Sequence, residues 1–309
     1  MSIQQYIRRC NLYVAGGDGE GMDLSNLRIK FVVKKSDAQS PNTAEITVYN
    51  LADSTTKQIK DEYKTCTLQA GYEGNFGVIF DGNIKQVIAG REDLVTKYLY
   101  LSVADGDAAY NYAVVNATLA AGATQEEQIT AASAPMTKLG ISQGYVDPLS
   151  KNQSKLPRGK TMFGASRDYL RTSAQSTNTV WSIQDGRLQV VKRSAVLPGQ
   201  AVVLTSKTGL VGAPEQTDKG IKIRCLINPT IRVGGTVKVN ESDVVEMKIS
   251  SAPKGSEANT PSSLSADGVY KVMVVEYTGD TFGTDWFCDL TCVGVDVTAP
   301  EGEQVEEEL

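Results

Sequence analysis

Histidine is absent from this chain of 309 residues. Because histidine is the commonest general base near neutral pH and the commonest metal ligand, its absence makes an enzyme or a metalloprotein less expected. Asp, Glu, Lys or Cys could still catalyse a reaction, but no nucleophile motif stands out. Tryptophan is scarce as well, with two residues, so the aromatic groove of a carbohydrate-active enzyme is not expected. We therefore predict no catalytic residues, no cofactor and no bound metal.

Long apolar segments are missing too. No run of the sequence approaches the roughly 18 apolar residues that span a membrane. The N-terminal segment MSIQQYIRRC lacks the apolar core of a signal peptide. Lys and Arg are dispersed and the formal net charge is −5, so no basic stripe indicates nucleic-acid binding. We expect a globular protein with neither a membrane nor a specific nucleic acid as its partner.

The five cysteines are odd in number and scattered, at positions 10, 66, 225, 288 and 292. We interpret them as free thiols in a reducing compartment. The spacing of Cys288 and Cys292 could suggest a metal or redox site. However, a period of two places both on one strand face with Trp286 and Leu290, and that face is apolar. We therefore assign both cysteines to a buried core.

Alternation of apolar and other residues marks the first third of the chain. It runs over residues 27–34 and again over 44–49, which predicts two half-buried strands joined by the turn-rich loop 36–43. Asp53 is the expected N-cap of a short helix that ends near Glu62. Three more strands, over residues 65–72, 77–84 and 97–106, complete a small barrel or sandwich.

The middle of the chain predicts helices. Thr124 and Glu127 have the spacing of a capping box, so a helix is expected from Thr124 to about Lys138. A second helix is predicted from about Met162 to Ser176, and we expect helices to be concentrated between Thr124 and Ser176. Asp185-Gly186 is a strong two-residue turn signal, which predicts a hairpin over residues 179–193.

The last third returns to strands, so the fold class is mainly β with an α+β insert. The candidate strands are residues 201–206, 220–227, 236–240, 244–250, 268–277 and 285–295, with a long loop over 250–268. We divide the chain into a first β domain (1–105), an α+β middle domain (106–195), a second β domain (196–297) and an acidic tail (298–309) that we expect to be disordered.

Several other segments invite a chemical interpretation. The glycines from Gly16 to Gly21 lack the ending of a phosphate-binding loop, so a connection between strands is favoured. Asp105 and Asp107 could ligate calcium, but the other positions of a calcium loop are missing and a turn is favoured. The basic loop 151–160 could contact nucleic acid or an acidic protein, although a solvated loop is favoured. A glycosidase would need two carboxyl groups across a sugar cleft, and the sequence identifies no such pair.

Seven segments resemble the tail-tube-like hub family of phage baseplates. Residues 45–51 (EITVYNL) resemble the strand that precedes a short helix in tail-tube and baseplate hub proteins. Six more resemble that family in order and spacing: residues 68–72 (LQAGY), 79–84 (IFDGNI), 102–106 (SVADG), 208–214 (TGLVGAP) with 226–229 (LINP), 267–272 (DGVYKV) and 279–286 (GDTFGTDW). One departure is Tyr277-Thr278, where histidine is expected in many relatives.

The chain thus looks like a baseplate hub protein of Mu-like contractile phage tails. The resemblance implies two tail-tube-like small β-barrel domains and a middle helix and hairpin domain. It implies a homotrimeric ring that presents six barrels, connects the six-fold tail tube to the three-fold central spike and lets DNA pass. The implied partners are the tail tube protein, the spike protein, the tape-measure protein and other baseplate proteins. The implied location is the virion tail, after assembly in the host cytoplasm.

Two other functions stay open at this point. A tail-tube initiator or distal tail adaptor would have six copies per ring instead of three. A tail-associated enzyme that degrades the cell wall would turn over peptidoglycan. In the hub interpretation, the acidic composition suits a duct that passes DNA without binding it. There the loop 36–43 is expected to reach the adjoining ring.

Overall fold

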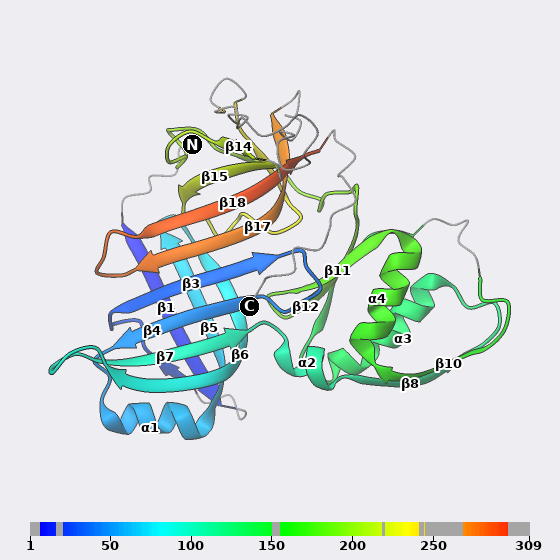
Figure 1. Cartoon of the computed structure of the whole chain (residues 1–309), viewed down its shortest axis with the longest axis horizontal. Coiled ribbons are helices and arrows are strands. Elements are labelled where there is room, and N and C mark those ends of the chain that lie inside the picture. The colour runs from blue at the N-terminus through cyan, green and yellow to red at the C-terminus, as the bar shows by residue number, and fades with distance from the viewer. Residues whose placement is uncertain are drawn as a thin grey trace, which may run out of the picture.

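The computed structural model describes residues 7–16, 21–149, 155–217, 220–240, 244 and 268–295. The described chain is mainly β, with a group of helices in its middle, which confirms the predicted fold class (Figure 1). The strand expected over 244–250, the long loop over 250–268 and the acidic tail lie outside the described residues, apart from Val244 and Gly268. None of the described helices is long and apolar enough to cross a membrane.

The first β region contains the predicted hairpin and the predicted short helix, although the N-cap of that helix is Ala52 and not Asp53. In the hairpin, Ile29, Phe31 and Val33 are buried on one face, as their alternation indicates. The loop between the two strands is the predicted 36–43 segment. The elements are β1 Arg8–Gly16, β2 Gly21–Asp23, β3 Ile29–Ser36, β4 Thr43–Tyr49, α1 Asp53–Glu62, β5 Tyr63–Tyr72, β6 Asn75–Arg91 and β7 Lys97–Ala104.

The middle unit packs helices against two small sheets and has its own core, which includes Met136, Leu170 and Trp181. The capping box is confirmed: Thr124 Oγ1 accepts a hydrogen bond from the Glu127 N–H, and the Glu127 carboxylate accepts one from the Thr124 N–H. The elements are α2 Asp107–Tyr112, β8 Val114–Leu119, α3 Gln125–Thr137, β9 Ser142–Val146, β10 Lys160–Ala165, α4 Ser166–Thr177, β11 Thr179–Gln184 and β12 Arg187–Lys192. The hairpin expected at the Asp185-Gly186 turn is β11 and β12.

The predicted start of the second helix at Met162 is wrong. Residues 160–165 form β10, which pairs with β8, and α4 begins only at Ser166. The physical reason is that Met162 is buried whereas Phe163 is 72% exposed, which is the alternation of a strand. Its strand partner β8 lies more than 40 residues earlier in the chain, so the short alternation over 160–165 is not distinguished from a helix face by the sequence alone.

The second β region joins the first in one sheet. Its elements are β13 Val202–Val203, β14 Glu215–Thr217, β15 Gly220–Leu226, β16 Thr236–Lys238, β17 Val269–Asp280 and β18 Trp286–Gly294. β17 pairs antiparallel with β3, so strands from both ends of the chain lie side by side (Figure 1). The apolar side chains of both regions therefore form one continuous core.

The strands of the two β regions follow the same order. The first region runs β3-β4-β7-β6-β5-β1, and the second runs β14-β15-β18-β17-β16-β13. The corresponding pairs are antiparallel in both regions, with one exception: β13 runs parallel to β16, whereas β1 runs antiparallel to β5. The two regions thus share one topology, as expected of two barrels of the same kind.

A β-bulge fixes the alignment of the two regions residue by residue. In the β6–β7 hairpin the pairing shifts between Ile84 and Gln86. In the β17–β18 hairpin it shifts between Val272 and Val274. In both hairpins the bulge lies in the first strand, and one residue of that strand has no partner in the second strand. Lys85 and Met273, the extra residues, therefore occupy equivalent positions.

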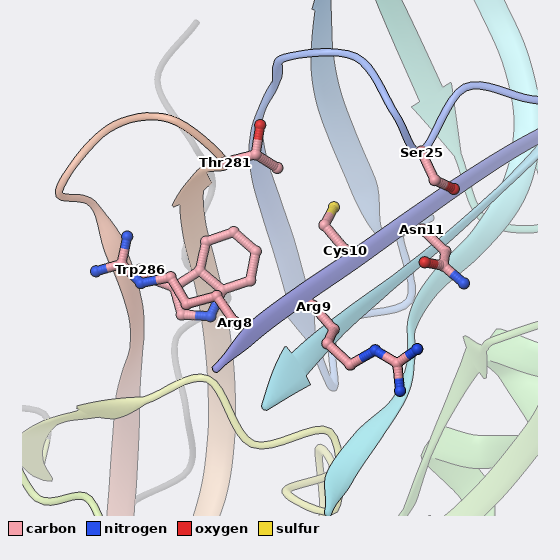
Figure 2. Close-up of a pocket in the computed structure, with 7 residues that line it drawn as sticks. All are labelled: Arg8, Arg9, Cys10, Asn11, Ser25, Thr281 and Trp286. Carbon is pink, nitrogen blue, oxygen red and sulfur yellow. The ribbon is translucent and has the colours of Figure 1, made fainter. Parts of the chain in front are cut away.

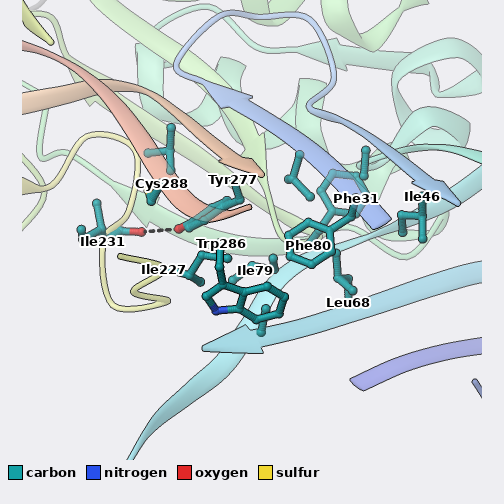
Figure 3. Packing of buried hydrophobic residues seen from close by; sticks show 14 of the residues in the cluster. Phe31, Ile46, Leu68, Ile79, Phe80, Ile227, Ile231, Tyr277, Trp286 and Cys288 are labelled. Atoms are coloured by element: carbon teal, nitrogen blue, oxygen red, sulfur yellow. Dashed lines mark hydrogen bonds between the residues drawn. The ribbon is translucent and has the colours of Figure 1, made fainter. Parts of the chain in front are cut away.

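The centre of the shared core lies where the two regions meet. The buried ring of Trp286 contacts the ring of Phe31 edge to face, with 5.5 Å between ring centroids (Figure 3). A Cβ atom at Gly279 would lie 2.3 Å from the Phe31 ring, so only glycine leaves room for this ring. The motif at residues 279–286 thus has a packing role in joining the two regions.

Candidate interaction surfaces

The junction between the sheet and the middle unit is built around Asp105. This carboxylate is fully buried at the end of β7 and accepts hydrogen bonds from the Asp185 N–H at 2.6 Å and the Gly186 N–H at 2.9 Å. Gly106 follows at φ 64°, and a Cβ atom there would lie 2.9 Å from Ile141. The two Asp-Gly turns that the sequence shows therefore bind each other and hold the middle unit against the sheet.

Lys35 and Asn42 strengthen this junction. The Lys35 ammonium lies 2.6 Å from the Asp185 carboxylate and also donates to the Ile79 carbonyl. The buried Asn42 amide donates to the Ile183 carbonyl and to the Gln184 side chain. The loop 36–43 is thus held by its ends against the middle unit and does not project freely. The expected contact with an adjoining ring stays a prediction for the exposed part of this loop.

The Asp105 carboxyl predicts a pH dependence of stability. Burial raises its pKa from 3.8 to about 6, although the Gly186 N–H acts in the opposite direction. Because the folded pKa is raised, this group contributes stability below about pH 4 that is lost as the pH rises through about 6. The loss amounts to about 3 kcal/mol of unfolding free energy.

Denaturant unfolding between pH 4 and 7 measures this effect. In Asp105→Asn the titrating carboxyl is gone, so the wild-type chain should lose about 3 kcal/mol relative to the variant over this range. The exposed Asp168→Asn is the matched control and should follow the wild-type profile. Parallel profiles of Asp105→Asn and wild type would contradict the assignment.

The cysteines do not form a reactive site. Cys225 faces Cys288 across β15 and β18, and both are buried together with Cys292 in the apolar core. All five cysteines are free. Burial raises the pKa of the Cys288 and Cys292 thiols far above the ordinary range, and raises that of Cys10 to about 12. These thiols therefore stay protonated, which fits the predicted core role.

The other segments with a possible chemical role are spread over the molecule. The Asp107 carboxylate accepts a hydrogen bond from the Asn111 side chain and lies 3.3 Å from the Lys85 ammonium, whereas Asp105 accepts from main-chain N–H groups, so the two carboxylates have different partners. Of the basic loop, residues 155–160 are described, and Lys160 donates to the Gln128 side chain. The glycine cluster connects the antiparallel strands β1 and β2, and its residues 17–20 lie outside the described residues. In the described part of the chain, no three potential ligands are grouped to hold a metal.

Two hollows in the described part of the chain bear on the glycosidase alternative. One, of about 260 Å³, lies between β1 and the β17–β18 turn and is lined by Arg8, Cys10 and Trp286 among others (Figure 2). The other, of about 400 Å³, lies between α3 and β9 and includes Glu126 and Asp147. The Asp147 carboxylate is already bonded to the Tyr145 hydroxyl and the Lys192 N–H.

Highly exposed apolar side chains lie on two equivalent turns. We call residues 92–96, between β6 and β7, and residues 281–285, between β17 and β18, the hairpin tips. Leu94 and Val95 are 94% and 86% exposed on the first tip, and Phe282 is 75% exposed on the second. Asp93 accepts from the Val95 and Thr96 N–H groups, and Asp280 accepts from the Phe282 N–H, so both tips are ordered. These ordered tips therefore offer apolar side chains that another molecule could cover.

Sequence reasoning missed both the Asp105 junction and the hairpin tips. The Asp-Gly pairs were visible as turns, but their mutual contact depends on residues 80 positions apart. The tips carry a weak signal, because exposed Leu and Val cannot be told from buried ones before the strand ends are known.

Comparison with known proteins gives one family and several similar folds. Residues 16–244 match the family model for baseplate hub gp41, which covers more than half of the chain. No curated protein sequence matches. The fold is similar to a 43 kDa tail protein of prophage MuSo2 from Shewanella oneidensis (TM-score 0.58, 9% identity, covering 93% of this chain and 97% of that chain). It is also similar to a tail protein from Neisseria meningitidis MC58 (TM-score 0.56, 10% identity, covering 93% of this chain and 96% of that chain).

A third similar structure is the E. coli c3393 protein, at a TM-score of 0.53 and 9% identity, covering 86% of this chain and 73% of that chain. That protein is described as a component of the type VI secretion system with structural similarity to the T4 phage tail proteins gp27 and gp5. At such identities these likenesses show the fold alone.

Proposed function

The chain belongs to the baseplate hub gp41 family of phage tail structural proteins, and on that premise we propose that it forms a homotrimeric ring between tail tube and spike. One observation carries the proposal: each chain contains the same strand topology twice. Three chains would therefore supply six similar barrels. Such a ring can match a six-fold tube on one side and a three-fold spike on the other.

The hairpin tips and the middle unit support a ring with one side for the tube and another for the spike. The hairpin tips occur on both β regions, so a trimer would present six ordered apolar tips, three with Leu94 and Val95 and three with Phe282. We propose that they contact the tail tube. The middle unit occurs once per chain and would present three copies, which suits the spike or other baseplate proteins. The tape-measure protein would end inside the ring, and DNA would pass through it.

In this proposal the chain has no catalytic role. Residues 1–105 and 196–297 are the two barrel domains, and residues 106–195 are the middle domain. The cysteines and the carboxylates of Asp105 and Asp147 are engaged in packing or hydrogen bonds. The virion tail is the working location, after assembly in the host cytoplasm.

Counting the chain in purified tails tests the proposal. Quantitative mass spectrometry against the tube protein should give three copies of this chain per tail. Six copies would indicate a tube initiator or distal adaptor instead. The same full-length protein, purified, should leave peptidoglycan uncleaved; cleavage that is lost on changing one carboxylate would show an enzyme.

A further inference from the structure

The start of strand β1 lies beside the second hairpin tip. The Arg8 guanidinium donates hydrogen bonds to the Gly283 and Thr284 carbonyls of that tip, at 2.9 and 3.2 Å (Figure 2). The hollow of about 260 Å³ runs along residues 8–11 of β1, and Thr281 of the tip lines it as well. A strand edge therefore adjoins the tip that we propose contacts the tail tube.

The hydrogen bonds of Leu12 fix the direction of the main-chain groups along β1. Its carbonyl accepts from the Leu24 N–H and its N–H donates to the Ser25 hydroxyl, so both groups point away from β5. Main-chain groups alternate along an antiparallel strand. The N–H and C=O groups of Arg8 and Cys10 therefore point away from β5 too, toward the hollow.

This edge of β1 is open at its start. β2 pairs only with residues 13–15 of β1, and the residues that follow β2 cover Leu12. Beyond the ladder to β5, no hydrogen bond joins the main chain of Arg8 or Cys10 to another described residue. Open main-chain groups at a sheet edge favour the addition of a strand from another molecule.

The open edge carries positive charge that no described carboxylate neutralises. The Arg9 side chain is exposed, lies 5.6 Å from the Phe76 ring centroid, and faces Gly71, which has no side chain, across β5. The ion pairs of the described residues include neither Arg8 nor Arg9. On an added strand, the residue opposite Arg9 occupies a non-hydrogen-bonded position, where the two side chains lie close together. An acidic side chain suits that position.

We propose that an extended, acidic segment of the tail tube protein adds as a strand to residues 8–10 of β1. Its main chain bonds to Arg8 and Cys10, an acidic side chain lies opposite Arg9, and its inward side chains fill the hollow against Thr281 and Trp286. The tube protein is the partner because a molecule that covers the second tip also lies over this hollow.

The contact rests on the proposed hub function and deepens it, since it adds a main-chain contact to the apolar contact of the tips. β1 occurs once per chain, so a ring of three chains offers three such edges. A six-fold tube ring would then be bound in this way at every second subunit.

A proline at position 10 tests the main-chain contact. Cys10→Pro removes the outward N–H and keeps the bonds of β1 to β5. Binding of the full-length protein to purified tubes of the same tail, measured by co-sedimentation, should weaken at least about tenfold. The matched control Cys10→Ala keeps the N–H and should bind as the wild type does. Circular dichroism and thermal unfolding show whether each variant is folded.

A charge reversal tests the acidic partner and leaves the main chain intact. Arg9→Glu places like charges opposite each other, so tube binding should weaken at least about fivefold at low salt and less at 1 M salt. Lys138→Glu, on the exposed end of α3, changes the net charge equally and is the control. It should bind tubes as the wild type does.

The outcomes separate this contact from the hub function. Weak tube binding by folded Cys10→Pro and by Arg9→Glu, with normal binding by both controls, supports the contact. If the wild type binds tubes and either folded variant binds them equally well, the β1 contact is overturned and the hub function stands. A wild-type protein that does not bind tubes, or six copies per tail, overturns the hub function itself.

Discussion

Replacing Trp286 with alanine is expected to lower the free energy of unfolding by about 4 kcal/mol. The side chain is fully buried, packs edge to face on Phe31 of the other β region, and lies under the Arg8 guanidinium at 5.6 Å from the ring centroid. Removing it leaves a cavity at the place where the two regions share their core. Urea unfolding of the full-length chain measures the loss.

Two other substitutions separate packing from mere loss of an aromatic ring. The Trp286 indole N–H has no hydrogen-bond partner among the described residues, so Trp286→Phe leaves no acceptor unpaired and should lose only about 2 kcal/mol. Phe282→Ala removes a ring that is 75% exposed and should change the stability by less than about 0.5 kcal/mol. An equal effect of Trp286→Ala and Phe282→Ala would contradict the shared core.

The second large effect is expected from the hairpin tips. In the variant Leu94→Ser, Val95→Ser, Phe282→Ser, the chain should keep its fold, but the proposed ring would lose the apolar side chains of all six tips. Because buried apolar anchors carry most of the energy of an interface, infectious titre should fall on the order of a hundredfold or more. Electron microscopy should show tubes that lack attached hubs.

The control for the tips removes apolar side chains elsewhere. Phe163→Ser with Val114→Ser changes exposed residues of the middle unit, 72% and 54% exposed, and should leave tubes attached. If the tip variant assembles normal tails, the hairpin tips do not contact the tube, although the hub function is unaffected. Thermal unfolding of each variant shows whether the fold is intact.

Local patterns predicted much of the fold. The alternation at Ile29 and Phe31, the capping box at Thr124 and the turn at Asp185-Gly186 depend on residues close in sequence, and all three are confirmed. The boundary of α4 was wrong because the partner of β10 was not recognised. Short strands with distant partners give a weak signal on their own.

What the sequence did not predict depends on long-range pairing. The β3–β17 contact joins residues more than 200 positions apart, and it decides that both β regions share one core. The Asp105 junction is likewise long-range, because Asp105 and Asp185 are 80 positions apart. The family resemblance supplied the hub function and the expectation of duplicated barrels, and the equivalent β-bulges align the two β regions residue by residue.

Cryo-electron microscopy of the assembled tail, at a resolution that separates strands, tests the central claim most directly. The account predicts one ring of three chains in which six barrels alternate between the first and second β regions, with the hairpin tips against the last tube ring. A ring of six chains, or a single barrel per chain, would contradict it.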